Sequence, residues 1–233
     1  MRWGRAAAAI VLAWSLLVAP ASGASTTRAL EVGGLRRTFA VHVPQSLPPG
    51  VPVPLVFVLH GGGGDGPQIE RHTGFSRVAD REGFIAVYPS AVDRNWNDGR
   101  GDPQIRSQAE GIDDVGFIAA VITRLADEYR IDPRRIFSTG ISNGGFMSQR
   151  LAAQLADRIA AIVAVAAGMA PAVAAGLRPS APVSVLVING TDDPLVPYGG
   201  GPVARTRGET ISTDRIVAAW VAANRCTGDP EVV

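Results

Sequence analysis

The chain has 233 residues, of which 46% are hydrophobic and 18% are charged. This composition is typical of one globular α/β domain, or two small domains at most, and excludes an intrinsically disordered chain. The net charge of +1 gives no electrostatic reason to expect nucleic acid or an anionic membrane as a partner, so we expect neither.

The N-terminus has the layout of an export signal. Arg2 and Arg5 form a short basic region, an uncharged apolar run covers 6–18, and small residues follow. The apolar run is shorter than the roughly 20 residues that span a bilayer, which favours a cleaved signal peptide over an uncleaved anchor. We therefore expect a signal peptide at 1–24, a mature domain at 25–233 and a secreted, extracellular protein.

Strands and helices alternate along the mature part. Strands are predicted at 36–43, 55–59, 84–88, 135–139, 160–166 and 183–189, and helices at 69–82, 114–130, 143–158 and 213–224. Asp132 and Pro133 predict a turn before the fourth strand. The alternation predicts a mainly parallel sheet with helices on both faces, and functional residues collect at the carboxyl ends of such strands.

A G-x-S-x-G pentapeptide, GISNG at 140–144, joins a predicted strand to a predicted helix. In that context the serine sits on a sharp turn, and glycines remove the Cβ atoms that would clash there. We therefore predict Ser142 as a nucleophile. A structural turn without chemistry is the alternative.

A glycine run, HGGGG at 60–64, ends an earlier strand. It predicts an oxyanion hole made by the backbone amides of Gly62 and Asn143, with His60 bracing the loop. The same glycines match the dinucleotide-binding pattern G-x-G-x-x-G, but the next predicted strand ends at 87–90 without the acid that would hold a ribose. We therefore expect no cofactor and no metal.

The segment GTDDP at 190–194 follows the last predicted strand. A carboxylate after the serine fits the Ser…Asp…His order of a catalytic triad, and Asp192 and Asp193 both qualify. A plain turn is the alternative.

No base follows that acid. His42, His60 and His72 are the only histidines and all precede the serine, and a serine without a base is a poor nucleophile. The single cysteine, Cys226, suggests an intermolecular bond or an absent partner in an exported protein, or else a small buried residue without a role.

Five segments together resemble the esterase family that includes poly(3-hydroxybutyrate) depolymerases and feruloyl or acetylxylan esterases. They are LHGGGGDG at 59–66, NWNDGRG at 95–101, DDVGFI at 113–118, GISNGG at 140–145 and NGTDDPLVPYGGG at 189–201. The resemblance implies an α/β-hydrolase fold, ester hydrolysis through an acyl-enzyme, and Asp193 as the triad acid. It also implies that Trp96 lies beside the active site, either shaping the acyl pocket or packing the loop, with His60 as the second candidate pocket residue. Asp113 and Asp114 are expected to cap the following helix.

The family carries its histidine in a C-terminal G-G-H-x-W-P-like segment, often with a further Cys, and this chain departs from that pattern. A sequence incomplete at its C-terminus, without the last strand and the His loop, accounts for both the absent base and the unpaired Cys226. The first hypothesis is therefore a monomeric, secreted hydrolase of a polyester or plant cell-wall ester, with Ser142 and Asp193. The second hypothesis is a non-catalytic exported protein that binds aromatic or polyester ligands in the cleft where the first hypothesis places the active site.

Overall fold

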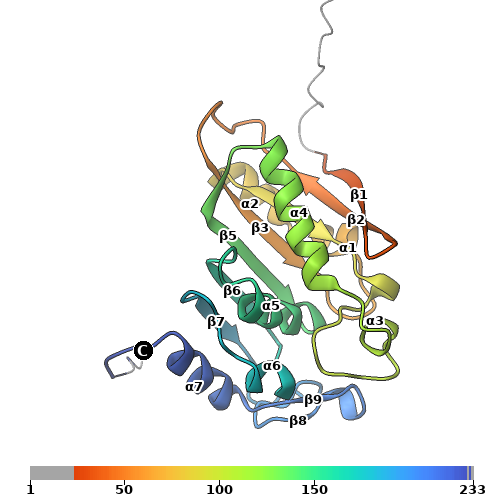
Figure 1. Cartoon of the computed structure of the whole chain (residues 1–233), viewed down its shortest axis with the longest axis vertical. Helices are drawn as coiled ribbons and strands as arrows, with labels where there is room; N and C mark the ends of the chain where they lie inside the picture. The colour runs from red at the N-terminus through yellow and green to blue at the C-terminus, as the bar shows by residue number, and fades with distance from the viewer. Residues whose placement is uncertain (1–23, 230, 232–233) are drawn as a thin grey trace, which may run out of the picture.

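The computed structural model describes residues 24–229 and residue 231. They form a seven-stranded sheet in the order β1-β2-β4-β3-β5-β6-β7, with helices on both sides (Figure 1). Its strands are β1 Thr26–Val32, β2 Leu35–His42, β3 Val53–Leu59, β4 Ile85–Pro89, β5 Ile131–Ile141, β6 Ala161–Val165 and β7 Ser184–Ile188. The helices are α1 Gly66–Thr73, α2 Phe75–Glu82, α3 Arg106–Ala109, α4 Asp114–Glu128, α5 Asn143–Gln154, α6 Pro171–Ala175 and α7 Thr213–Ala223. A two-stranded ribbon, β8 Gly201–Pro202 and β9 Glu209–Thr210, precedes α7.

The sheet is mainly parallel, as predicted. Strands β4, β3, β5, β6 and β7 run parallel to one another, whereas β1 and β2 are antiparallel additions at one edge. The predicted signal peptide lies outside the described residues, apart from Ala24. No helix in the described part of the chain combines the length and the apolar character needed to cross a bilayer.

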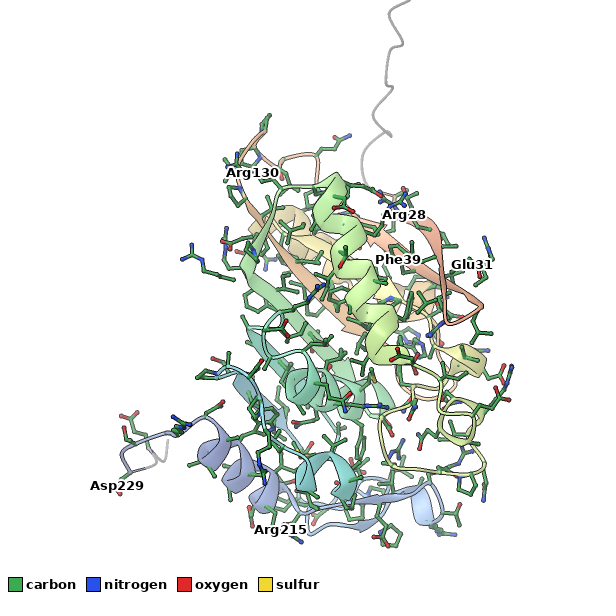
Figure 2. All side chains as sticks on the ribbon, viewed as in Figure 1. Arg28, Glu31, Phe39, Arg130, Arg215 and Asp229 are labelled. Carbon is green, nitrogen blue, oxygen red and sulfur yellow. The ribbon has the colours of Figure 1, made fainter. Side chains whose placement is uncertain are left out.

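Two apolar layers hold the helices to the sheet. One face of the central strands packs against α1 and α2 through small and aromatic side chains such as Ala86 and Tyr88. The other face packs against α4 and α5, where Phe39 of β2 meets Phe117 edge-to-face with ring centroids 6.4 Å apart (Figure 2). Edge-to-face contacts of this kind add to the free energy of burial.

Two predicted boundaries differ from the structure. The helix predicted at 69–82 is two helices, because Gly74 takes a left-handed φ of 63° and its amide closes α1 on the Glu70 carbonyl, 3.0 Å away. The turn predicted at Asp132 and Pro133 is a bulge within β5 instead, since the pairing with β3 shifts register there. An extra stretch of one strand is accommodated in this way without ending the strand.

The carboxyl ends of three parallel strands lie level with one another. Ile141 of β5 pairs with Val165 of β6, and Val165 pairs with Ile188 of β7. Leu59, the last residue of β3, pairs with Gly140 on the other side of β5. The loops after β3, β5, β6 and β7 therefore all leave the sheet at the carboxyl ends of its parallel strands.

Strand β7 is the last strand of the sheet and pairs only with β6 among the described residues. Its residues Leu186 and Ile188 are 53% and 51% exposed, on a face that no described helix covers. Its alternate residues Val185 and Val187 line a cleft of about 750 Å³ between β7 and α7. None of the residues that line this cleft belongs to the GISNG turn or to the glycine run.

Candidate active site

The residues 140–144 form a strained turn between β5 and α5. Ser142 has φ 52° and ψ −123°, and its amide donates to the Val165 carbonyl at 2.9 Å. Its own carbonyl accepts the first hydrogen bond of α5, from Phe146 at 3.0 Å. A positive φ at a non-glycine residue is costly, and in this position it lifts a serine hydroxyl above the sheet edge.

The flanking glycines are required by close backbone contact. A Cβ on Gly140 would lie 2.4 Å from the carbonyl of Gly144, and one on Gly144 would lie 2.4 Å from the Leu59 carbonyl oxygen. Distances this short are not tolerated between non-bonded heavy atoms. Helix α5 therefore starts in direct contact with the end of β3, which brings the two loops together.

The loop after β3 leaves two backbone amides without an acceptor. Gly63 donates to the Arg94 carbonyl at 2.8 Å and Gly64 donates to the Gly61 carbonyl at 3.0 Å. The amides of Gly61 and Gly62 have no hydrogen-bond acceptor within the part of the chain that the structure describes. Two free donors in a glycine loop are what an oxyanion hole needs.

The amide of Asn143 supplies a third free donor. It is the first residue of α5, where backbone N–H groups lack a partner within the helix. Gly62 lies close to it, since a Cβ on Gly62 would be 3.9 Å from the Asn143 Cβ. The two predicted oxyanion donors are thus neighbours in the fold, beside Ser142.

His60 and Trp96 lie beneath this turn, and both side chains are buried. Their rings stack with centroids 4.9 Å apart, and the Trp96 indole donates to the His60 carbonyl at 3.0 Å. His60 Nε2 accepts from the Ala91 amide at 3.1 Å, so Nδ1 carries the proton and donates to the Gly61 carbonyl at 2.8 Å. Burial lowers the pKa of His60 and keeps it neutral. Of the two roles open to these residues, the burial supports bracing the loop rather than lining a pocket.

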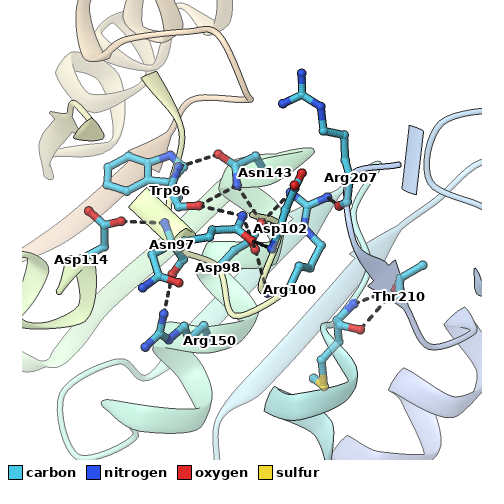
Figure 3. Close-up of polar contacts among 12 residues, drawn as sticks. Trp96, Asn97, Asp98, Arg100, Asp102, Asp114, Asn143, Arg150, Arg207 and Thr210 are labelled. Atoms are coloured by element: carbon cyan, nitrogen blue, oxygen red, sulfur yellow. Dashed lines mark hydrogen bonds and ion pairs between the residues drawn. The ribbon is translucent and has the colours of Figure 1, made fainter. Parts of the chain in front are cut away.

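The side chain of Asn143 is held from two directions (Figure 3). Its Oδ1 accepts from the Trp96 amide at 2.7 Å, while its Nδ2 donates to the Trp96 carbonyl at 3.1 Å and to Asp98 Oδ2 at 2.6 Å. These residues are 45 or more positions apart in the sequence, so sequence patterns did not indicate that they meet. The loop 95–102, which carries Trp96 and Asp98, is thereby fixed to the start of α5.

Asp113 and Asp114 differ in role, although both were expected to cap α4. Asp113 is the cap, with its side chain accepting from the Gly116 amide at 2.7 Å. Asp114 is buried and forms an ion pair with Arg37 at 2.5 Å, and its second oxygen accepts from the Asn97 amide at 2.7 Å. Desolvation by burial raises the pKa of Asp114, although Arg37 favours its charged form. The expectation of a second cap was wrong because this carboxylate points into the protein.

Asp193 follows β7, and like Ser142 it lies beyond the carboxyl end of a parallel strand. Its Oδ1 accepts from the amides of Leu195 at 2.8 Å and Val196 at 3.0 Å, whereas its Oδ2 has no hydrogen-bond donor among the described residues. Asp192 is exposed and makes no side-chain hydrogen bond within that part of the chain. Asp193 is therefore the more ordered carboxylate, with one oxygen available.

None of the histidines is placed as a base for Ser142. His42 ends β2 beside the start of β4, at the amino ends of the parallel strands and so away from Ser142. It pairs with Asp80 at 2.7 Å. His72 lies exposed on α1. Both ring nitrogens of His60 are used in hydrogen bonds, to the backbone of Gly61 and of Ala91. Cys226 is a free, exposed thiol that lines the cleft between β7 and α7.

Comparisons with known proteins identify the family of the chain. A model of the family described as esterase PHB depolymerase matches residues 39–196. NocK of Nocardia uniformis subsp. tsuyamanensis, which is named as an esterase, is 36% identical over 187 residues, covering 78% of this chain and 52% of NocK. The bifunctional acetylxylan esterase/xylanase XynS20E of Neocallimastix patriciarum is 28% identical over 165 residues, covering 71% of this chain and 22% of its own length.

Among solved structures, a thermostable esterase superposes with a TM-score of 0.64 at 19% identity, covering 86% of this chain and 52% of that one. The fold is that of an α/β-hydrolase, as expected. The chain spans about half the length, or less, of these relatives. The family match covers most of the sheet, the glycine loop, the serine turn and Asp193, and the chain therefore belongs to the esterase PHB depolymerase family.

Proposed function

We propose that the natural protein carrying this chain is an exported carboxylic ester hydrolase that works through a serine acyl-enzyme. The strained turn of Ser142 carries the proposal, since it sits beside the free amides of Gly62 and Asn143. A hydroxyl next to two unpartnered N–H donors suits a reaction in which negative charge develops on a carbonyl oxygen.

The chemistry follows from that placement. The Ser142 oxygen attacks the ester carbonyl carbon and gives up its proton to a base, and the carbonyl oxygen becomes an oxyanion. The amides of Gly62 and Asn143 stabilise that oxyanion. Collapse of the tetrahedral intermediate breaks the ester bond, the base returns the proton to the leaving alcohol, and water then hydrolyses the acyl-serine in the same manner.

Asp193 is proposed to orient that base. The strands that lead to Ser142 and to Asp193 are separated by β6, which places their ends about 10 Å apart. An imidazole with one hydrogen bond on each side fits a gap of this order. The free Oδ2 of Asp193 would accept from such an imidazole, while the two amides on Oδ1 fix the carboxylate.

We propose that the base comes from polypeptide outside these 233 residues, in a segment that extends the sheet along β7. Two features of the described residues support this origin: none of them pairs with the outer edge of β7, and none of their helices covers the face that exposes Leu186 and Ile188. A bare strand edge with apolar neighbours is unfavourable in water and is usually covered. The greater length of the relatives is consistent with such a segment.

The substrate class is proposed from the relatives, which also include feruloyl esterases: a polyester or a plant cell-wall ester such as acetylxylan or a feruloyl ester. The apolar run near the N-terminus supports export. The same run would also suit the alternative, an exported protein that binds aromatic or polyester ligands beside Ser142 without hydrolysing them.

Hydrolysis of p-nitrophenyl acetate by the protein made from the complete natural reading frame tests the proposal. We expect turnover that falls about 1,000- to 10,000-fold in Asp193→Asn. The neighbouring Asp192→Asn is the matched control and should keep its activity within about threefold. Ligand binding without turnover in the wild type would favour the non-catalytic alternative. Equal losses of activity in the two variants would show that Asp193 is not the acid of the triad.

A further inference from the structure

A fully buried carboxylate lies behind the oxyanion donor Asn143. The Asp98 side chain accepts from Asn143 Nδ2 at 2.6 Å and from Gln108 Nε2 at 3.0 Å. It also forms an ion pair with Arg100, whose Nε and Nη2 lie 2.9 and 2.8 Å from Oδ2 (Figure 3). A buried charge is tolerated only where it is paired and hydrogen-bonded, so each of these partners is needed.

We propose that Asp98 is a positioning residue that sets the direction of the Asn143 backbone amide in the oxyanion hole. This inference rests on the proposed ester hydrolysis. Asp98 touches neither the serine nor the expected substrate position. It acts through the carboxamide of Asn143, whose orientation it fixes together with Trp96.

The start of α5 needs such a device. Ser142 holds an unfavourable backbone conformation, and no side chain caps the helix at that residue. A strained turn relaxes unless the surrounding structure holds it. Asn143 is the first residue after it, and its side chain makes three hydrogen bonds to the loop 95–102. A change of rotamer at Asn143 is therefore blocked, and the peptide between it and Ser142 keeps its orientation.

Arg100 extends the same support toward the acid. Its guanidinium lies over the Phe146 ring of α5, 4.4 Å from the centroid, and its Nη1 donates to the Arg207 carbonyl at 2.9 Å. Arg207 belongs to the segment between β8 and β9, which joins the Asp193 loop through the Ala204 amide and the Leu195 carbonyl, 2.7 Å apart. The Asp98–Arg100 pair thus connects the oxyanion side of the site with the segment that carries the acid.

The kinetic test uses the complete natural protein and Asp98→Asn. The carboxamide that replaces Asp98 removes the negative charge that pairs with Arg100 and turns one of the two acceptor oxygens into a donor, so kcat should fall about 100-fold while KM stays within about twofold. Asp102→Asn is the control: Asp102 is a buried acid of the same loop whose side chain accepts from Gln104, not from Asn143. It should change kcat by less than about threefold.

A second variant covers the case in which Asp98→Asn does not fold. Asn143→Ala keeps the backbone amide but removes the carboxamide, and it should lower kcat by a similar factor. A kcat within about threefold of the wild type in either variant, or an increase in KM with kcat unchanged, would overturn the proposal.

A measurement that needs no turnover separates this inference from the proposed function. The 15N relaxation of the 233-residue chain should give Asn143 a backbone order parameter of about 0.85, falling toward 0.6 in Asp98→Asn and unchanged in Asp102→Asn. An unchanged Asn143 in Asp98→Asn would overturn the positioning role whether or not esters are hydrolysed. Absence of hydrolysis in the wild type would instead overturn the proposed function.

Discussion

Trp96 and Asn143 are joined by two hydrogen bonds that run in opposite directions. The Trp96 amide donates to the Asn143 side chain at 2.7 Å, and that side chain donates back to the Trp96 carbonyl at 3.1 Å. A carboxamide paired in this way stands in for a neighbouring strand, since it satisfies both backbone groups of a buried residue. The loop 95–102 and the serine turn consequently behave as one unit.

The close approach of α5 to β3 predicts that Gly144→Ala destabilises the protein. Its Cβ would lie 2.4 Å from the Leu59 carbonyl oxygen and 2.6 Å from that of His60. Overpacking of this kind costs about 1–3 kcal/mol, and more where backbone must move. Urea unfolding should show a loss of at least about 2 kcal/mol.

Gly176→Ala is the control for that measurement. Gly176 has a negative φ, and the nearest atom to its added Cβ is 3.5 Å away. This variant should be neutral, or more stable by up to about 1 kcal/mol through the unfolded state. Equal effects in the two glycine variants would mean that α5 and β3 are not in backbone contact.

The neutral His60 predicts a loss of stability on acidification. Burial lowers its folded pKa below the ordinary value of 6.5, so below pH 6.5 the unfolded chain binds a proton that the folded protein does not. The contribution of His60 to the free energy of unfolding is therefore fully present above pH 6.5. It is lost as the pH drops below that value, by up to about 1.4 kcal/mol per pH unit.

The contribution of His60 is isolated by comparing variants. His60→Gln should be less stable than the wild type at pH 7.5, and the difference should shrink toward pH 5. The exposed His72→Gln should follow the wild type at both pH values. A wild-type-like pH dependence in His60→Gln would show that folding leaves the pKa of His60 unchanged, and would contradict this account.

The ion pair of Arg37 and Asp114 predicts a large effect of a single substitution. Both side chains are buried, and Asp114→Asn would leave the Arg37 charge without its partner. Breaking one side of a buried pair costs about 3–5 kcal/mol.

The double variant Arg37→Leu/Asp114→Leu checks this explanation by chemical denaturation. It should be more stable than Asp114→Asn alone, because no unpaired charge remains. A double variant that loses the sum of the two single effects would instead mean that the pair acts through packing and not through its charges.

Much of the fold could be predicted from the sequence. The apolar runs at 55–59, 84–88 and 183–189 correspond to strands, because short β-rich runs of this kind suit the inner strands of a sheet that is covered on both faces. Strand β1 was not predicted, although Gly33 and Gly34 with positive φ provide the hairpin signal that would have indicated it.

The candidate site could be predicted only in part. The serine turn and the glycine loop are local motifs, because their backbone conformation and close contacts require glycine at positions that the sequence shows directly. The Asp98–Asn143 contact is not local, because it depends on how a loop folds over the sheet edge 45 residues away. The separate roles of Asp113 and Asp114 likewise depend on Arg37, which lies on a distant strand.

Labelling by a fluorophosphonate probe tests the role of Ser142 most directly. The complete natural protein should be labelled, and mass spectrometry should place the adduct on Ser142. Labelling should disappear in Ser142→Ala, and denaturation before exposure to the probe should abolish it in the wild type. An adduct on another residue, undiminished labelling of Ser142→Ala, or no labelling of the folded wild type would contradict the assignment of Ser142 as the nucleophile.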